Sequence, residues 1–124
     1  MTADEMMFFD RMPDLLPLYE VLRDKLQSAY PNMGIKVAKT QISFRNRHVF
    51  AMASLPWRKA KGWPAEYLLV SFGLPGQKQS PRIAQSVEAY PNRWTHHVIV
   101  QRPDEIDTEL LDWMDEAYRF SMAK

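Results

Sequence analysis

The chain has 124 residues and a formal net charge of +1, from 16 Lys and Arg against 15 Asp and Glu. Hydrophobic residues make up 46% and charged residues 25%, a composition typical of a folded globular domain rather than a disordered chain. The small net charge argues against bulk attraction to nucleic acid, and the absence of Cys excludes disulfides, thiol catalysis and thiolate metal sites. We therefore expect one domain over residues 1–124.

The first predicted helix begins at Asp14, which can cap it, and ends before Pro31 and Gly34. Its apolar residues recur at helical spacing and form one face: Leu15, Leu18, Tyr19, Leu22 and Leu26. Residues 6–9 upstream are too apolar for a free tail and predict a short helical turn that packs on the core. The acidic start at residues 1–5 is unlike a signal peptide, and no apolar run approaches the ~20 residues of a membrane helix. We expect a cytoplasmic protein without membrane contact.

The middle of the chain has the alternation and β-branched content of strands. The predicted strands are residues 35–37, 41–45, 48–55, 66–74 and 93–101. The apolar parity changes between Val37 and Ile42, which predicts a bulge or turn near Lys39 and Thr40. Residues 56–65 read as a loop, and residues 77–92 read as a long connection with room for one helical turn.

A last helix is predicted from the segment 103–107, with Asp104 as its cap. Its apolar stripe consists of Ile106, Leu110, Trp113, Met114, Ala117 and Tyr118. The simplest assembly is an α+β fold, in which a central antiparallel sheet of about five strands carries the N-terminal and C-terminal helices on one face. The other face is left for solvent, a ligand or a second subunit.

Four blocks of sequence carry a family resemblance. They are Phe8-Phe9, residues 39–44, residues 93–98, and residues 105–107 leading to Trp113 and residues 116–118. In this order they resemble a bacterial family of domains catalogued as domain of unknown function five-six-five-five. The resemblance spans nearly the whole chain and implies a small α+β fold, but it implies no activity, cofactor or catalytic residue.

Cations and a hydroxyl within these blocks suggest an anion site. If the strands of Lys39 and Arg93 lie together, two cations and the Thr40 hydroxyl converge, which suits a phosphate or carboxylate. Arg82 on the long connection would close over the ligand, and His96 would be a polar group at the pocket floor that tunes affinity with pH. The alternative is that Lys39 and Arg93 pair with acids of the last helix and that His96 is a hydrogen-bonded core residue.

Other chemistries have weaker signals. His96 and His97 are adjacent on a strand and point to opposite faces, and no metal-ligand spacing, phosphate loop or nucleophile elbow occurs. We therefore expect no metal, no cofactor and no catalytic residue, and an enzyme with either histidine as general base has the least support. The segment 57–63 places two tryptophans around three cations and could stack on unpaired bases, although its shortness favours a solvated loop.

The sequence thus predicts a non-catalytic binding module for a small anionic ligand. The pocket would consist of Lys39, Thr40, Arg82, Arg93 and His96. The alternative is a protein-interaction or self-association module that docks through the open sheet face or through Trp57 and Trp63. Nucleic acid is an unfavoured partner because the chain is nearly neutral.

Overall fold

The structure is a computed structural model that describes residues 1–56 and 61–124. Its helices are α1 (Ala3–Phe8), α2 (Leu16–Ala29) and α3 (Thr108–Met122), with 3-10 turns η1 (Pro13–Leu15) and η2 (Pro103–Glu105) ahead of α2 and α3. Its strands are β1 (Gly34–Val37), β2 (Ile42–Arg45), β3 (Val49–Ser54), β4 (Leu68–Leu74), β5 (Ile83–Tyr90) and β6 (Arg93–Val100).

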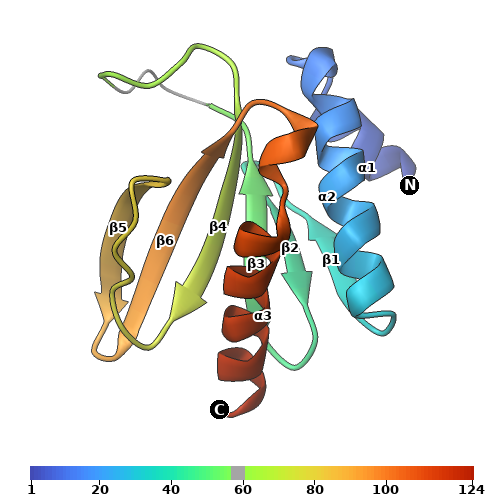
Figure 1. The fold of residues 1–124 in the computed structure, drawn as a ribbon. Helices are drawn as coiled ribbons and strands as arrows, with labels where there is room; N and C mark the ends of the chain where they lie inside the picture. The colour runs from blue at the N-terminus through green and yellow to red at the C-terminus, as the bar shows by residue number, and fades with distance from the viewer. Residues whose placement is uncertain (57–60) are drawn as a thin grey trace.

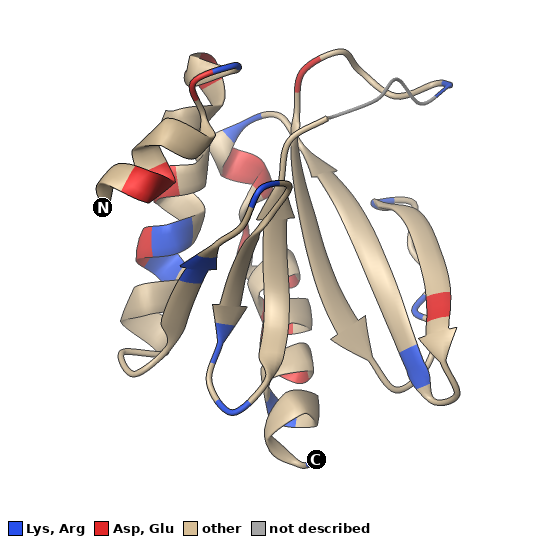
Figure 2. Cartoon of the chain, turned by 180° about the vertical axis from the view of Figure 1, so that it is seen from behind, with Lys and Arg blue, Asp and Glu red and all other residues tan. Residues whose placement is uncertain are grey.

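The six strands form one antiparallel sheet in the order β1-β2-β3-β4-β6-β5. Figure 1 shows α2 and α3 on the same side of the sheet, α2 beside the β1 edge and α3 in front of β3. Seen from behind, no described helix covers the opposite side, which we call the open face (Figure 2). The predicted α+β fold with its helices on one face is confirmed, with six strands where about five were expected.

Strand β5 is the addition, and it lies in the segment that was expected to be a long connection. Its register with β6 shifts twice, and most of its residues are exposed. These irregularities remove the strict alternation by which a strand is recognised in a sequence. The hairpin that joins β5 to β6 turns at Asn92, whose φ of 66° lies in the left-handed region that Asn tolerates well.

The core lies between the two long helices and the sheet. The predicted stripe of α2 is buried through Leu18, Tyr19, Leu22 and Leu26, and the α3 stripe is buried from Ile106 to Ala117. Both helices begin later than expected, α2 with its cap one residue after Asp14 and α3 with its cap three residues after Asp104. Asp14 lies in η1, and the cap of α3 is Asp107, whose side chain accepts a hydrogen bond of 3.0 Å from the Leu110 amide, while Asp104 lies in η2.

Helix α1 is fastened to α2 by a buried carboxylate. Glu5 is 1% exposed and accepts hydrogen bonds from the Thr2 backbone, the Tyr19 hydroxyl and Arg23 Nε, the last at 2.8 Å. Burial raises the pKa of Glu5, but these hydrogen bonds and the Arg23 charge outweigh it and hold the pKa below its ordinary value. Among the described residues, no helix has the length and apolar character needed to cross a membrane.

Candidate functional site

The predicted ligand residues do not gather in one place. Lys39 and Thr40 lie in the turn between β1 and β2, whereas Arg93 begins β6, and strands β3 and β4 stand between β2 and β6. The strand register aligns the Lys39 end of this hairpin with Val98, so Arg93 lies toward the opposite end of the sheet. The predicted convergence of Lys39 and Arg93 is therefore wrong, because it required their strands to be neighbours.

Arg82 is also engaged elsewhere. Its guanidinium donates to Asp107 and Glu109, each at 2.9 Å, and to the Glu105 carbonyl at 2.7 Å, and it lies 5.8 Å from the centre of the Trp113 ring. These contacts fasten the start of β5 to the start of α3. Arg82 is thus not free to close over the Lys39 turn. The alternative in which Lys39 and Arg93 pair with acids of the last helix is also wrong, because neither forms an ion pair in the described part of the chain.

Arg93 lies on the open face, over the backbone of Gly73. A Cβ atom placed on Gly73 would come within 2.6 Å of the Arg93 Cζ atom, so the absence of a side chain at Gly73 leaves room for the guanidinium. Within the described residues, no carboxylate forms an ion pair with Arg93. Arg93 is an available cation, but it is isolated from the other predicted ligands.

A hydroxyl–imidazole pair also occupies the open face. Ser71 Oγ and His97 Nδ1 are 2.7 Å apart. Burial, followed by the neighbouring His96, lowers the pKa of His97. Ser71 is only 3% exposed, and in the described part of the chain no carboxylate hydrogen-bonds to His97 to orient its ring. The pair therefore lacks both the access and the acid of a Ser–His–acid triad.

Lys39 and Thr40 share a pocket with a different cation, Arg11. Together with Phe8 and Leu55 these residues line a pocket of about 210 Å³, which we call the hairpin pocket. Its polar lining is two cations and one hydroxyl, without a carboxylate. A wider hollow of about 580 Å³ continues from it past α1. That outer hollow also contains Asp4 and Asp10.

Two local features position the hairpin pocket. The Ala38 amide donates to the Gln41 carbonyl at 2.9 Å, which closes the turn and carries Lys39 and Thr40 beyond the end of the sheet. On the opposite wall, the buried Glu5 holds α1 against α2 and so fixes Phe8 at the end of α1. The predicted turn at Lys39 and Thr40 is confirmed.

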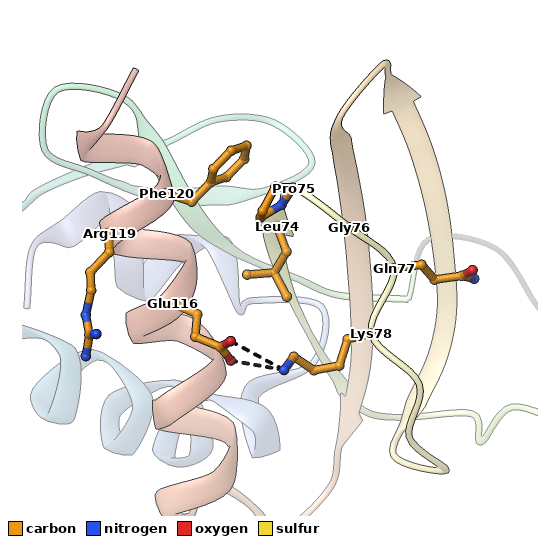
Figure 3. A pocket seen from close by; sticks show the side chains of 8 residues that line it. All are labelled: Leu74, Pro75, Gly76, Gln77, Lys78, Glu116, Arg119 and Phe120. Atoms are coloured by element: carbon orange, nitrogen blue, oxygen red, sulfur yellow. Dashed lines mark hydrogen bonds and ion pairs between the residues drawn. The ribbon is translucent and has the colours of Figure 1, made fainter.

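A second, larger pocket lies between α3 and the loop that follows β4, and we call it the α3 pocket (Figure 3). Its volume is about 590 Å³. The sheet and loop contribute Leu74, Pro75, Gly76, Gln77 and Lys78, and α3 contributes Glu116, Arg119 and Phe120. Lys78 Nζ and Glu116 Oε2, 3.1 Å apart, form an ion pair across the pocket (Figure 3).

His96 does not line the α3 pocket, but its buried ring holds the loop that does. The ring is fully buried and stacks on Phe72 at 5.4 Å between centroids, and Nε2 accepts the Lys78 amide hydrogen at 2.9 Å. Burial lowers the pKa of His96, so the ring is neutral near pH 7 and carries its proton on Nδ1. Nδ1 has no hydrogen-bond partner among the described residues. His96 is thus a core residue that holds the pocket loop.

Sequence reasoning missed Arg11, Lys78, Glu116 and Phe120. Glu116 lies in the last of the four family blocks but was not assigned a role there, and Arg11, Lys78 and Phe120 belong to no motif. Lys78 is 38 residues from Glu116 in the chain, so only the tertiary fold brings them together. Residues 57–60 of the tryptophan-flanked segment lie outside the described residues. Trp63 is half-buried and packs edge-on against Tyr67, with 5.8 Å between the ring centres. In residues 1–56 and 61–124, no three His, Asp or Glu side chains are grouped to hold a metal ion.

The model of the family described as domain of unknown function (DUF5655) matches residues 5–121. The chain belongs to this family. The matched range contains every residue that lines the hairpin pocket and the α3 pocket. No curated protein matches the chain, and no solved structure matches it. Membership of this family agrees with the resemblance found in the sequence and assigns no activity.

Proposed function

We propose that the chain is a non-catalytic module that binds a small oxyanion in the hairpin pocket. The observation that carries this proposal is the polar lining of the pocket, which is Arg11, Lys39 and Thr40 without a carboxylate. Neither cation forms an ion pair with an acid in the described part of the chain. Both charges are therefore available to a ligand.

The residue types suit an oxyanion. Arg11 can donate two parallel hydrogen bonds to a phosphate or carboxylate, Lys39 supplies a point charge, and the Thr40 hydroxyl donates a further bond. Phe8 and Leu55 form the apolar sides of the pocket. The volume of about 210 Å³ is below the roughly 300 Å³ at which pockets for drug-sized ligands begin. The pocket therefore fits a phosphate, a sulfate or a short carboxylate.

The adjacent acids set an upper limit on ligand size. Asp4 and Asp10 line the outer hollow beside α1. A larger anion whose charge extends into that hollow meets two like charges, which disfavours its binding. This arrangement favours a compact anion over an extended polyanion such as a nucleic acid.

The test is isothermal titration calorimetry with inorganic phosphate and, separately, acetate at low ionic strength. We expect phosphate to bind, and Arg11→Ala and Lys39→Ala each to weaken it about tenfold, the loss of one charge-assisted hydrogen bond. Lys36→Ala is the matched control, because Lys36 is an exposed cation of β1 that lines neither pocket. Unchanged affinity in Lys39→Ala, or no binding of either ion, would show that the proposal is wrong.

The edge of β5 favours a second function, self-association. Beyond β6, this strand of 8 residues has no further partner among the described strands. Val87 is 45% and Tyr90 is 53% exposed, and Glu88 is the strand's one charged residue. A long, exposed and nearly uncharged edge is a template for pairing with another strand.

A second copy of the chain fits this edge. Antiparallel pairing about a two-fold axis at Val87 places Val87 against its own counterpart and Glu88 against Ser86, which avoids a contact between two Glu88 side chains. Because the chain lacks Cys, single cysteines report this register directly. We expect Val87→Cys to form an intermolecular disulfide under mild oxidation and Glu88→Cys to form much less. A wild-type chain that sediments as a monomer at every concentration would contradict self-association.

A further inference from the structure

The α3 pocket combines an apolar wall with a single ion pair. Leu74, at the end of β4, is 5% exposed, and Pro75 and Phe120 complete the apolar part of the lining (Figure 3). Lys78 reaches across from the loop to Glu116 on α3. We infer that this pocket binds a small zwitterion with an apolar side chain, the chemistry of a free apolar α-amino acid.

The charges that face the pocket sum to zero. Arg119 belongs to the lining, but its side chain is 78% exposed, points away from Lys78 in Figure 3 and pairs with Asp115 one turn earlier in α3. The charges that remain are the Lys78 ammonium and the Glu116 carboxylate. A neutral ligand that carries both charges therefore matches the pocket better than an anion does.

An ion-pair exchange explains this preference. A carboxylate alone draws Lys78 away from Glu116 and leaves the Glu116 carboxylate without its partner, which costs part of the free energy gained. A zwitterion replaces the single ion pair with two, because its carboxylate accepts from Lys78 and its ammonium donates to Glu116. Glu116 is half-exposed, so the exchange does not require either charge to leave water completely.

The pocket is held in shape before any ligand arrives. The Lys78 amide is bound to the buried His96, and the Lys78 ammonium lies 5.8 Å from the centre of the Trp113 ring. Two buried residues, His96 and Trp113, thus fix the loop and the direction of the Lys78 side chain. Binding a ligand therefore costs little conformational entropy in this loop. The volume of about 590 Å³ lies within the roughly 300–1,000 Å³ of small-molecule pockets and accommodates a side chain as large as that of phenylalanine.

Three probes of one shape test the inference: phenylalanine, 3-phenylpropionate, which lacks the ammonium, and phenethylamine, which lacks the carboxylate. Binding is followed by amide chemical shifts in NMR spectra, which locate the site as well as measure affinity. We expect phenylalanine to shift the amides of Gly76, Lys78 and Phe120 and to bind at least about tenfold more tightly than either analogue, the effect of one lost charged contact.

Substitutions then assign the contacts. Glu116→Gln is expected to abolish the preference for phenylalanine over 3-phenylpropionate, whereas Phe120→Ser is expected to weaken all three probes. Asp112→Asn is the matched control, because Asp112 is an exposed acid of α3 that does not line the pocket. The inference is overturned if 3-phenylpropionate binds as well as phenylalanine to the wild type, if the shifts map elsewhere, or if phenylalanine does not bind at millimolar concentration.

Discussion

The hairpin pocket and the α3 pocket lie toward opposite ends of the sheet, and each contains two cations in its lining. In the hairpin pocket, Arg11 and Lys39 have no acid in the lining. In the α3 pocket, Lys78 is paired with Glu116 and Arg119 with Asp115. The comparison predicts that the charge of the ligand each pocket prefers depends on which cations already have carboxylate partners, and not on the number of cations.

The two pockets are also supported by opposite kinds of buried group. The hairpin pocket depends on a charged residue, Glu5, which is held by Tyr19 and Arg23. The α3 pocket depends on a neutral one, His96, which accepts the Lys78 amide. Removing each support in turn should weaken ligand binding in one pocket and leave ligand binding in the other unchanged.

The largest effect is expected from Glu5→Ala. It leaves the buried Tyr19 hydroxyl and the partly buried Arg23 without their shared acceptor, so we expect the free energy of unfolding to fall by about 3 kcal/mol. Urea denaturation measures this loss. The variant should also bind phosphate more weakly, because α1 carries Phe8, while phenylalanine binding to the folded protein persists. Asp4→Ala, an exposed change on the same helix, should stay within about 0.5 kcal/mol; equal losses in both variants would contradict this role of Glu5.

His96→Phe is expected to have the next largest effect. It keeps an aromatic ring against Phe72 but removes the acceptor of the Lys78 amide, so we expect a loss of about 2 kcal/mol in stability. Phenylalanine should bind several-fold more weakly while phosphate binding is unchanged, a pattern that general destabilisation does not produce. His48→Phe, at an exposed position, is the control. Unaltered phenylalanine affinity in His96→Phe would show that the loop does not need this anchor.

Much of this fold is readable from the sequence because its elements bury periodic apolar faces. The stripes of α2 and α3 and most strands follow from local patterns, since each pattern reports one buried side. Strand β5 does not, because it is an exposed edge strand with two register shifts. Its edge position leaves little apolar burial to mark it.

The candidate site is less predictable, because it depends on which elements become neighbours. The sequence indicates the Lys39–Thr40 turn, since the apolar parity changes there. It does not indicate that Arg11 meets this turn or that two strands separate the turn from Arg93. Arg82 illustrates the same limit, because its partners Asp107 and Glu109 lie 25 and 27 residues away in the chain and only the tertiary fold brings them to it.

Acidification is expected to lower the stability of the fold without changing the affinity of the hairpin pocket for sulfate. His96 and His97 both have pKa values below the ordinary value near 6.5, because burial disfavours their charged forms. Below about pH 6.5 the unfolded chain therefore binds more protons than the folded one, and stability falls as pH is lowered toward the folded-state values. The decrease is at most about 1.4 kcal/mol per pH unit for each histidine.

Thermal unfolding from pH 8 to pH 5 measures this effect, and His97→Gln should flatten the profile. Sulfate binding to the hairpin pocket should stay constant over the same range, because neither His96 nor His97 lines that pocket. Stability that rises on acidification would contradict the role given to the histidines. Sulfate affinity that changes with pH in step with stability would contradict the prediction that the hairpin pocket binds independently of them.

The smallest effect expected is the difference in salt dependence between the two ligands. Arg11 and Lys39 are exposed, so added salt screens their attraction for sulfate, and affinity should fall a few-fold between about 0.02 M and about 0.2 M sodium chloride as the Debye length shortens. Phenylalanine has no net charge and enters a pocket of no net charge, so its affinity should change less than about twofold. Calorimetry of both ligands on the same protein gives the two slopes. Equal slopes would mean that the α3 pocket attracts its ligand as an anion, in which case Glu116 does not take part in recognition.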